Sequence, residues 1–131
     1  MKWLVDVNVL VALAHQGHAE HTRVIRWFAS LIGTEVRLGT CAITEIGFVR
    51  VSIQAGFENH AADAAETLQG LKESSRIPFD LIPDALGASR LPTYVSGARQ
   101  VTDGHLLELA RESSMELATL DKGIPGAFVV P

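Results

Sequence analysis

The sequence predicts an α/β sandwich built around a mainly parallel sheet. Short apolar runs with strand character alternate along the chain with longer segments whose apolar residues follow helical spacing. This alternation is typical of parallel sheets, because a crossover between two parallel strands is usually a helix. The chain has 131 residues and an apolar fraction of 47%, which are ordinary values for one globular domain. We therefore place a single domain over residues 1–131.

Five short segments predict strands. The first, Lys2 to Val7, is a mostly apolar run of the kind found in a buried strand. Pro78 and Pro83 bound another short run and favour an edge position for it. The expected strands are residues 2–7, 36–38, 79–82, 117–120 and 128–130.

The helical segments are indicated by their spacing and by their end signals. Val24, Trp27 and Leu31 repeat at the spacing of one helix face. Asn59 and Thr102 are residue types that commonly cap helix N-termini. The expected helices are residues 8–14, 18–31, 42–53, 59–71 and 102–113, with residues 84–89 left open between helix and irregular chain.

Composition excludes two classes of protein. The single cysteine, Cys41, precludes an internal disulfide, reads as a small buried apolar residue, and fits a reducing, cytoplasmic setting. No apolar run approaches the roughly 20 residues that a membrane-spanning helix needs. We expect a cytoplasmic protein without a membrane partner.

Four acidic residues stand beside segments that read as core. They are Asp6 after the first expected strand, Glu45 within ITEIGFVRV, Asp103 within VTDGHLLELA and Asp121 at the end of ELATLD. An unpaired buried carboxylate is costly, and neither Asp6 nor Asp103 has a basic neighbour in the sequence. Asp6 and Asp121 follow strands, and ligands of open α/β sheets bind beyond those strand ends. If the four carboxylates converge, a cation must lie between them.

Net charge agrees with such a site. The chain has 15 acidic and 11 basic residues, for a net charge of −4, and setting the four acids aside leaves 11 of each. Bound divalent cations would therefore offset much of the excess, so the acidic balance does not exclude a nucleic-acid partner.

The segments DVNVLVAL, ITEIGFVRV, VTDGHLLELA and LATLDKG, in this order, resemble those of the PIN-domain ribonucleases, and most of all the VapC toxins of VapBC toxin–antitoxin modules. The resemblance implies a PIN-like three-layer α/β/α sandwich with a mainly parallel central sheet, and metal-assisted hydrolysis of RNA phosphodiester bonds. It implies Mg²⁺ or Mn²⁺ as the cofactor, with Asp6 and Asp103 as direct ligands. The acidic cluster it implies is Asp6, Glu45, Asp103 and Asp121.

Three further residues are candidates for supporting roles. Asn8 could orient Asp6 or simply start the helix. Thr119 could hydrogen-bond a ligand, because alternate strand residues share a face, or could be a plain strand residue. Arg50 could meet an RNA phosphate or pair with a site acid. Among the partners, the resemblance implies an RNA substrate, a homodimer and a VapB-type antitoxin, which lays an apolar segment in a groove and sets a basic side chain against the acids.

Alternative interpretations remain open at this point. Within the family, a stand-alone PIN nuclease in RNA processing would need no antitoxin. Outside it, a Mg²⁺-binding receiver-like signalling domain also gathers acids at strand ends, but it needs adjacent acids after the first strand and a lysine on a late strand, which Asp6-Val7-Asn8 and Lys122 fit poorly. A phosphatase of the haloacid-dehalogenase type needs Asp-x-Asp, where this chain has Asn8. The remaining candidates are His15, His18 and His21, which we interpret as a solvated loop and helix entry rather than a zinc site, and Arg90 and Arg99 as RNA contacts. Gly104, after Asp103, is expected to loosen the first helical turn by up to ~1 kcal/mol.

Overall fold

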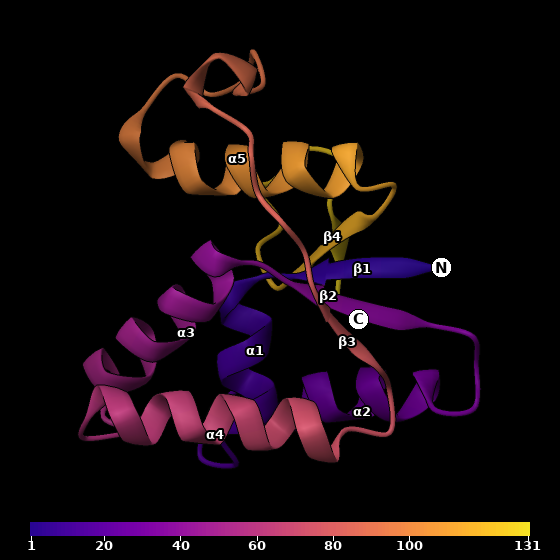
Figure 1. Ribbon diagram of the computed structural model, residues 1–131, viewed down its shortest axis with the longest axis vertical. Coiled ribbons are helices and arrows are strands. Elements are labelled where there is room, and N and C mark those ends of the chain that lie inside the picture. Colours follow the sequence, from indigo (N-terminus) through magenta and orange to yellow (C-terminus); the bar gives the residue numbers. More distant parts are fainter.

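A five-stranded parallel sheet forms the centre of the computed structural model, which describes residues 1–131 (Figure 1). The strand order is β3-β2-β1-β4-β5, and every pair of neighbours is parallel. The strands are β1 (Lys2–Val5), β2 (Arg37–Thr40), β3 (Phe79–Leu81), β4 (Glu116–Thr119) and β5 (Phe128–Val129). The predicted parallel sheet is confirmed, with β3 at one edge as expected.

Helices cover both faces of this sheet. Figure 1 shows α1 to α4 on one side and α5, with a short 3₁₀ turn η1, on the other, which confirms the three-layer arrangement. The helices are α1 (Val7–Ala14), α2 (His21–Leu31), α3 (Ala42–Gln54), α4 (Ala61–Ser74) and α5 (Ala98–Glu112), and η1 spans Ala88–Arg90. No helix is both long and apolar enough to cross a membrane.

The two faces of the sheet bury two separate cores. Successive strand side chains point to opposite faces, so Trp3 and Val5 pack with α1 and α2 whereas Leu4 packs with α5. On the larger side, the Trp3 ring lies 5.5 Å from that of Trp27 and 5.1 Å from that of Phe128. Burial on both faces is clearest in the central strands β1, β2 and β4, each of which has three consecutive buried residues.

The chain changes direction across the sheet at β1. From β1 it proceeds to β2 and β3 on one side, and then crosses to β4 and β5 on the other. The C-terminal ends of β1 and β4 are therefore neighbours at a topological switch point, where open α/β sheets bind their ligands. The backbone N–H of Asp6 donates to the carbonyl of Ala118 at 2.9 Å and joins the two ends.

Helix α5 begins four residues earlier than its sequence suggests. Its N-cap is Gly97, and the side chain of Gln100 accepts hydrogen bonds from the N–H groups of Ser96 and Gly97 at 2.8 and 3.2 Å. Asp103 consequently lies in the second turn, where the helix dipole favours a carboxylate much less. The predicted capping role of Thr102 is wrong.

Gly104 has a packing role in this longer helix. It is buried in the helix interior, and a Cβ atom there would lie 2.3 Å from Cγ2 of Val95. The absence of a side chain therefore lets the preceding segment lie directly on α5. The expectation that Gly104 loosens a first turn is wrong, because the first turn lies elsewhere.

Other helix starts also shift. Asp6, rather than Asn8, is the N-cap of α1, and its carboxylate accepts from the N–H of Val7 at 2.7 Å. Helix α2 starts at His21 instead of His18, and α4 is capped by His60. Such shifts of one to three residues are normal for ends inferred from local signals.

Candidate metal centre and active site

Asp6 is the most deeply buried acid of the chain, with 6% of its surface exposed. Its Oδ1 accepts from the N–H of Val7, and its Oδ2 accepts from the hydroxyl of Thr119, both at 2.7 Å. Burial raises the pKa of the Asp6 carboxyl, the two hydrogen bonds oppose that rise, and the charge of Asp121 adds to it. An ionised Asp6 is therefore held in place but is not neutralised.

The hydroxyl of Thr119 connects the elements around Asp6. Besides donating to Asp6, it accepts from Nδ2 of Asn8 at 3.3 Å and from the N–H of Asp121 at 3.0 Å. Asn8 in turn accepts from the N–H of Leu120 at 3.2 Å through Oδ1. Asn8 and Thr119 thus fix the end of β4 against the start of α1, and the reading of Thr119 as a plain strand residue is wrong.

Asp103 and Asp121 reach the same place from other elements. Asp103 is half-buried on α5, and its pKa is raised first by burial, then by the charge of Asp6 and then by that of Asp121. Asp121 is exposed just beyond β4, where its Oδ1 accepts from the N–H of Gly123 at 2.7 Å. None of the three acids forms an ion pair. They form one electrostatic group, which we call the acidic cluster.

Glu45 is held separately from the acidic cluster. Its Oε2 accepts both from the hydroxyl of Thr40 and from Nζ of Lys72 on α4, each at 2.6 Å. Of the four predicted acids, Glu45 is therefore the one that has a lysine counter-ion within the chain.

The donors of the acidic cluster suit a hard divalent cation. No group of three or more His, Cys, Asp or Glu side chains is arranged closely enough to hold an ion by itself. Mg²⁺ commonly takes only one or two carboxylates and completes its octahedron with waters and substrate phosphates. Asp6 and Asp103, which are mutually repelling and lack a cationic partner, fit that pattern.

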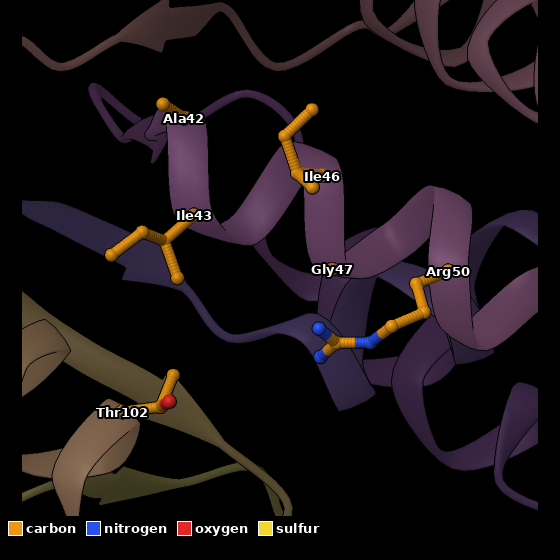
Figure 2. A pocket seen from close by; sticks show the side chains of 6 residues that line it. All are labelled: Ala42, Ile43, Ile46, Gly47, Arg50 and Thr102. Atoms are coloured by element: carbon orange, nitrogen blue, oxygen red, sulfur yellow. The ribbon is translucent and has the colours of Figure 1, made fainter.

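Arg50 lines a groove between α3 and α5. Figure 2 shows Ile43, Ile46 and Arg50 on α3, with Thr102 across from them on α5. The groove has a volume of about 400 Å³, and the exposed Arg50 has no hydrogen-bond or ion-pair partner in the chain. Its guanidinium is therefore free to meet an external anion, and the predicted pairing with a site acid does not occur.

Two polar side chains near the site, Lys72 and Tyr94, cannot be predicted as site residues from their neighbours in the sequence. Lys72 lies 27 residues after Glu45, and only the packing of α4 on α3 brings them together. The hydroxyl of Tyr94 is buried without a hydrogen-bond partner, and its pKa is raised by burial and then by the charge of Asp103. A structure was needed to find both.

The other polar candidates have structural partners. His15 is buried between the rings of Phe48 and Phe57, and its Nε2 lies 3.0 Å from the hydroxyl of Ser52. The solvated-loop reading is wrong for His15. Arg90 is paired with Glu108 and Glu112, and its contact with RNA stays a prediction. The remaining contacts are His21 with the carbonyl of Ala12, and His105 with Asp84.

Comparison with known proteins identifies the class. The family model for the PIN domain matches residues 3–127. Ribonuclease VapC38 of Mycobacterium tuberculosis is 40% identical over 124 residues, which cover 92% of this chain and 86% of the relative. Ribonuclease VapC29 of the same organism is 36% identical over 125 residues, covering 95% and 89%. The chain therefore belongs to the PIN-domain family and, within it, to the VapC ribonucleases.

A solved structure supports the same fold. The crystal structure of Mycobacterium tuberculosis VapC20, described as a toxin that cleaves the sarcin–ricin loop, superposes with a TM-score of 0.68 over all of both chains at 13% identity. Ribonucleases with a PIN domain generally need a divalent metal. The receiver-like and phosphatase interpretations are excluded by this family membership.

Proposed function

We propose that this ribonuclease acts with Mg²⁺, or Mn²⁺ in its place, held by Asp6 and Asp103 with Asp121 close by. The observation that carries the proposal is the buried Asp6 carboxylate, which Thr119 and the N–H of Val7 hold in place and which has no lysine or arginine partner. Burial and the neighbouring acids raise the pKa of both Asp6 and Asp103, as expected for carboxylates that lack a cation. Neighbouring carboxylates without a cation destabilise the folded state, and a bound metal ion between them would remove that cost.

Each residue of the proposed site has its own role in RNA cleavage. A bound divalent cation supplies Lewis-acid chemistry, since it makes water a stronger acid and offsets charge on the phosphodiester. Thr119 and the N–H of Val7 hold the Asp6 carboxylate in one orientation. Asn8 fixes Thr119, and the unpaired Arg50 contacts an RNA phosphate near the cleaved bond. No nucleophilic side chain is required; Cys41 is buried.

The test removes the charge of Asp6 and keeps its shape. In Asp6→Asn, we expect cleavage of RNA with Mg²⁺ to fall by at least about 100-fold, the scale for losing one electrostatic stabiliser of the transition state. Asp63→Asn on the exposed surface of α4 is the matched control. Folding is checked by circular dichroism. Wild-type cleavage by a folded Asp6→Asn protein would overturn the proposed site.

We further propose that the chain works in the cytoplasm as a toxin restrained by a VapB-type antitoxin. An apolar antitoxin segment fits the groove between α3 and α5, because Ile46 and Ile43 are 68% and 37% exposed there and Arg50 awaits an acidic partner. The groove residues Ile46 and Thr102 are sequence neighbours of Glu45 and Asp103, and we expect a basic side chain of the bound antitoxin segment to extend from the groove to the acids.

Co-purification with the small protein encoded beside this gene tests the groove. We expect Ile46→Asp to abolish binding of the antitoxin and to leave RNA cleavage intact. Ile25→Asp, on the exposed face of α2, is the control and should still bind the antitoxin. The homodimer is a separate proposal, tested by light scattering on the same variants. Loss of the dimer in Ile46→Asp with the antitoxin retained would assign the groove to a second copy instead.

A further inference from the structure

The ion pair of Lys72 and Glu45 links α4 to α3, the helix that carries the predicted site acid Glu45. Nζ of Lys72 lies 2.6 Å from Oε2 of Glu45, and the two side chains are only 16% and 25% exposed. Each of the other lysine or arginine pairs with an acid has a cation at least 30% exposed. A shielded pair of this kind is screened little by salt, and losing one partner strands the other charge.

The way in which Glu45 is held is asymmetric. Lys72 and the buried hydroxyl of Thr40 both donate to Oε2. Oε1 has no hydrogen-bond donor within the chain. A carboxylate has roughly four lone-pair sites, so two donors on one oxygen fix the group and leave the other oxygen available. Oε2 therefore fixes the Glu45 side chain in place, and Oε1 can accept a further bond.

We propose that Lys72 is a positioning residue for catalysis, which holds Glu45 so that Oε1 faces the metal-binding edge of the sheet. The inference deepens the proposed function and rests on it. Glu45 lies in the first turn of α3, and that helix follows β2 at the same C-terminal edge as Asp6. In this position Glu45 would bind a metal ion or one of its waters, and its repulsion from the acidic cluster would be small because Lys72 balances its charge.

A purely structural role for Lys72 is the competing explanation. Under that explanation, the ion pair simply ties α4 to α3. The two helices already share an apolar core through Phe48, Ala64 and Leu68, all of them at least 96% buried. We therefore expect α4 to stay docked when the ion pair is lost, and Lys72 variants to remain folded. The two explanations differ in what happens to metal affinity.

The experiment compares Lys72→Met, which keeps the aliphatic stem, with Lys72→Arg, which keeps the charge. Mg²⁺ binding to the RNA-free protein is measured by titration calorimetry, and Mg²⁺ half-activation by RNA cleavage. We expect Lys72→Met to weaken both by about 10–100-fold, the usual cost of losing a group that orients a metal ligand. Lys72→Arg should keep most of the wild-type Mg²⁺ affinity. Arg76→Met, which removes an exposed cation beyond the end of α4, should leave Mg²⁺ affinity unchanged.

A second substitution separates the possible failures. In a Glu45→Gln background, Lys72→Met should have no further effect on Mg²⁺ affinity, because the carboxylate it positions is gone. Wild-type affinity in a folded Lys72→Met protein, or tighter Mg²⁺ binding, would overturn the inference and leave the proposed function intact. If instead the wild-type protein bound no Mg²⁺, or Asp6→Asn left binding and cleavage unchanged, the proposed function itself would fail.

Discussion

Replacing Thr119 by valine tests the hydrogen-bond network on which Asp6 depends. The substitution keeps the branched shape in a strand and removes a hydroxyl that donates to Asp6 and accepts from Asn8 and from the N–H of Asp121. The bond to the carboxylate is charge-assisted and buried, whereas the N–H of the exposed Asp121 can turn to water. Most of the effect should therefore come from Asp6.

The expected loss of stability follows from these three bonds. The hydrogen bond to the charged Asp6 contributes about 1.5–3 kcal/mol and the neutral one from Asn8 about 0.5–1.5 kcal/mol, whereas water replaces the one from the N–H of Asp121. We therefore expect Thr119→Val to lower the free energy of unfolding by about 2–4.5 kcal/mol. The hydrogen bond from Thr119 also lowers the pKa of Asp6. The loss should accordingly be largest at neutral pH and shrink as acid protonates Asp6.

Urea unfolding, followed by the fluorescence of the buried Trp3 and Trp27, measures the change in metal-free protein. Thr119→Ser is the matched control, because it keeps the hydroxyl and loses one methyl group, worth about 1 kcal/mol. In an Asp6→Asn background, the cost of Thr119→Val should fall. A Thr119→Val protein within about 0.5 kcal/mol of wild type, the scale of ordinary surface substitutions, would refute the network as the source of this stability.

Two further predictions concern α5. Because burial, Asp6 and Asp121 raise the pKa of Asp103 above its usual 3.8, the metal-free wild type should lose stability as pH rises from 3.8 through that higher value. Asp103→Asn should then be more stable than the wild type at neutral pH and equally stable below pH 3.8. Added Mg²⁺ should stabilise only the wild type. Equal melting temperatures of the two metal-free proteins at neutral pH would contradict the raised pKa of Asp103. Gly104→Ala gains up to ~1 kcal/mol of helix propensity but forces a Cβ to 2.3 Å from Val95, a crowding that typically costs about 1–3 kcal/mol. We expect net destabilisation by urea unfolding, and stabilisation in a Val95→Ala background; a stabilised single variant would disprove the close packing.

Local signals were enough to predict the sheet. Continuous apolar runs mark strands buried on both faces, and the ends of β1 and β4 place Asp6 and Asp121 at one edge without any knowledge of packing. The start of α5 was missed because Thr102 is a favourable cap type, whereas the actual cap uses Gly97 with Gln100 three residues on. Competing local signals of similar strength cannot be ranked without the tertiary structure.

Contacts between side chains far apart in the chain could not be predicted from the sequence. Lys72 is an unremarkable helix residue until α4 packs on α3, and His15 reads as solvated until Phe48 and Phe57 enclose it. In both cases the partner lies more than 25 residues away. Periodicity reports which face of an element is apolar but not which side chain of another element it meets.

The counter-ion of Glu45 changes the charge balance at the site. Four acids equal the whole net charge of −4, but Lys72 balances one of them, so the acidic cluster itself holds three. One divalent cation would leave these three carboxylates with a net charge of about −1 when an RNA phosphate arrives with another. Phosphate binding then needs positive charge from a second ion or from Arg50, which has no partner in the chain. If Arg50 supplies it, Arg50→Met should weaken RNA binding and leave Mg²⁺ affinity unchanged, whereas a second ion would make activation cooperative in Mg²⁺ concentration.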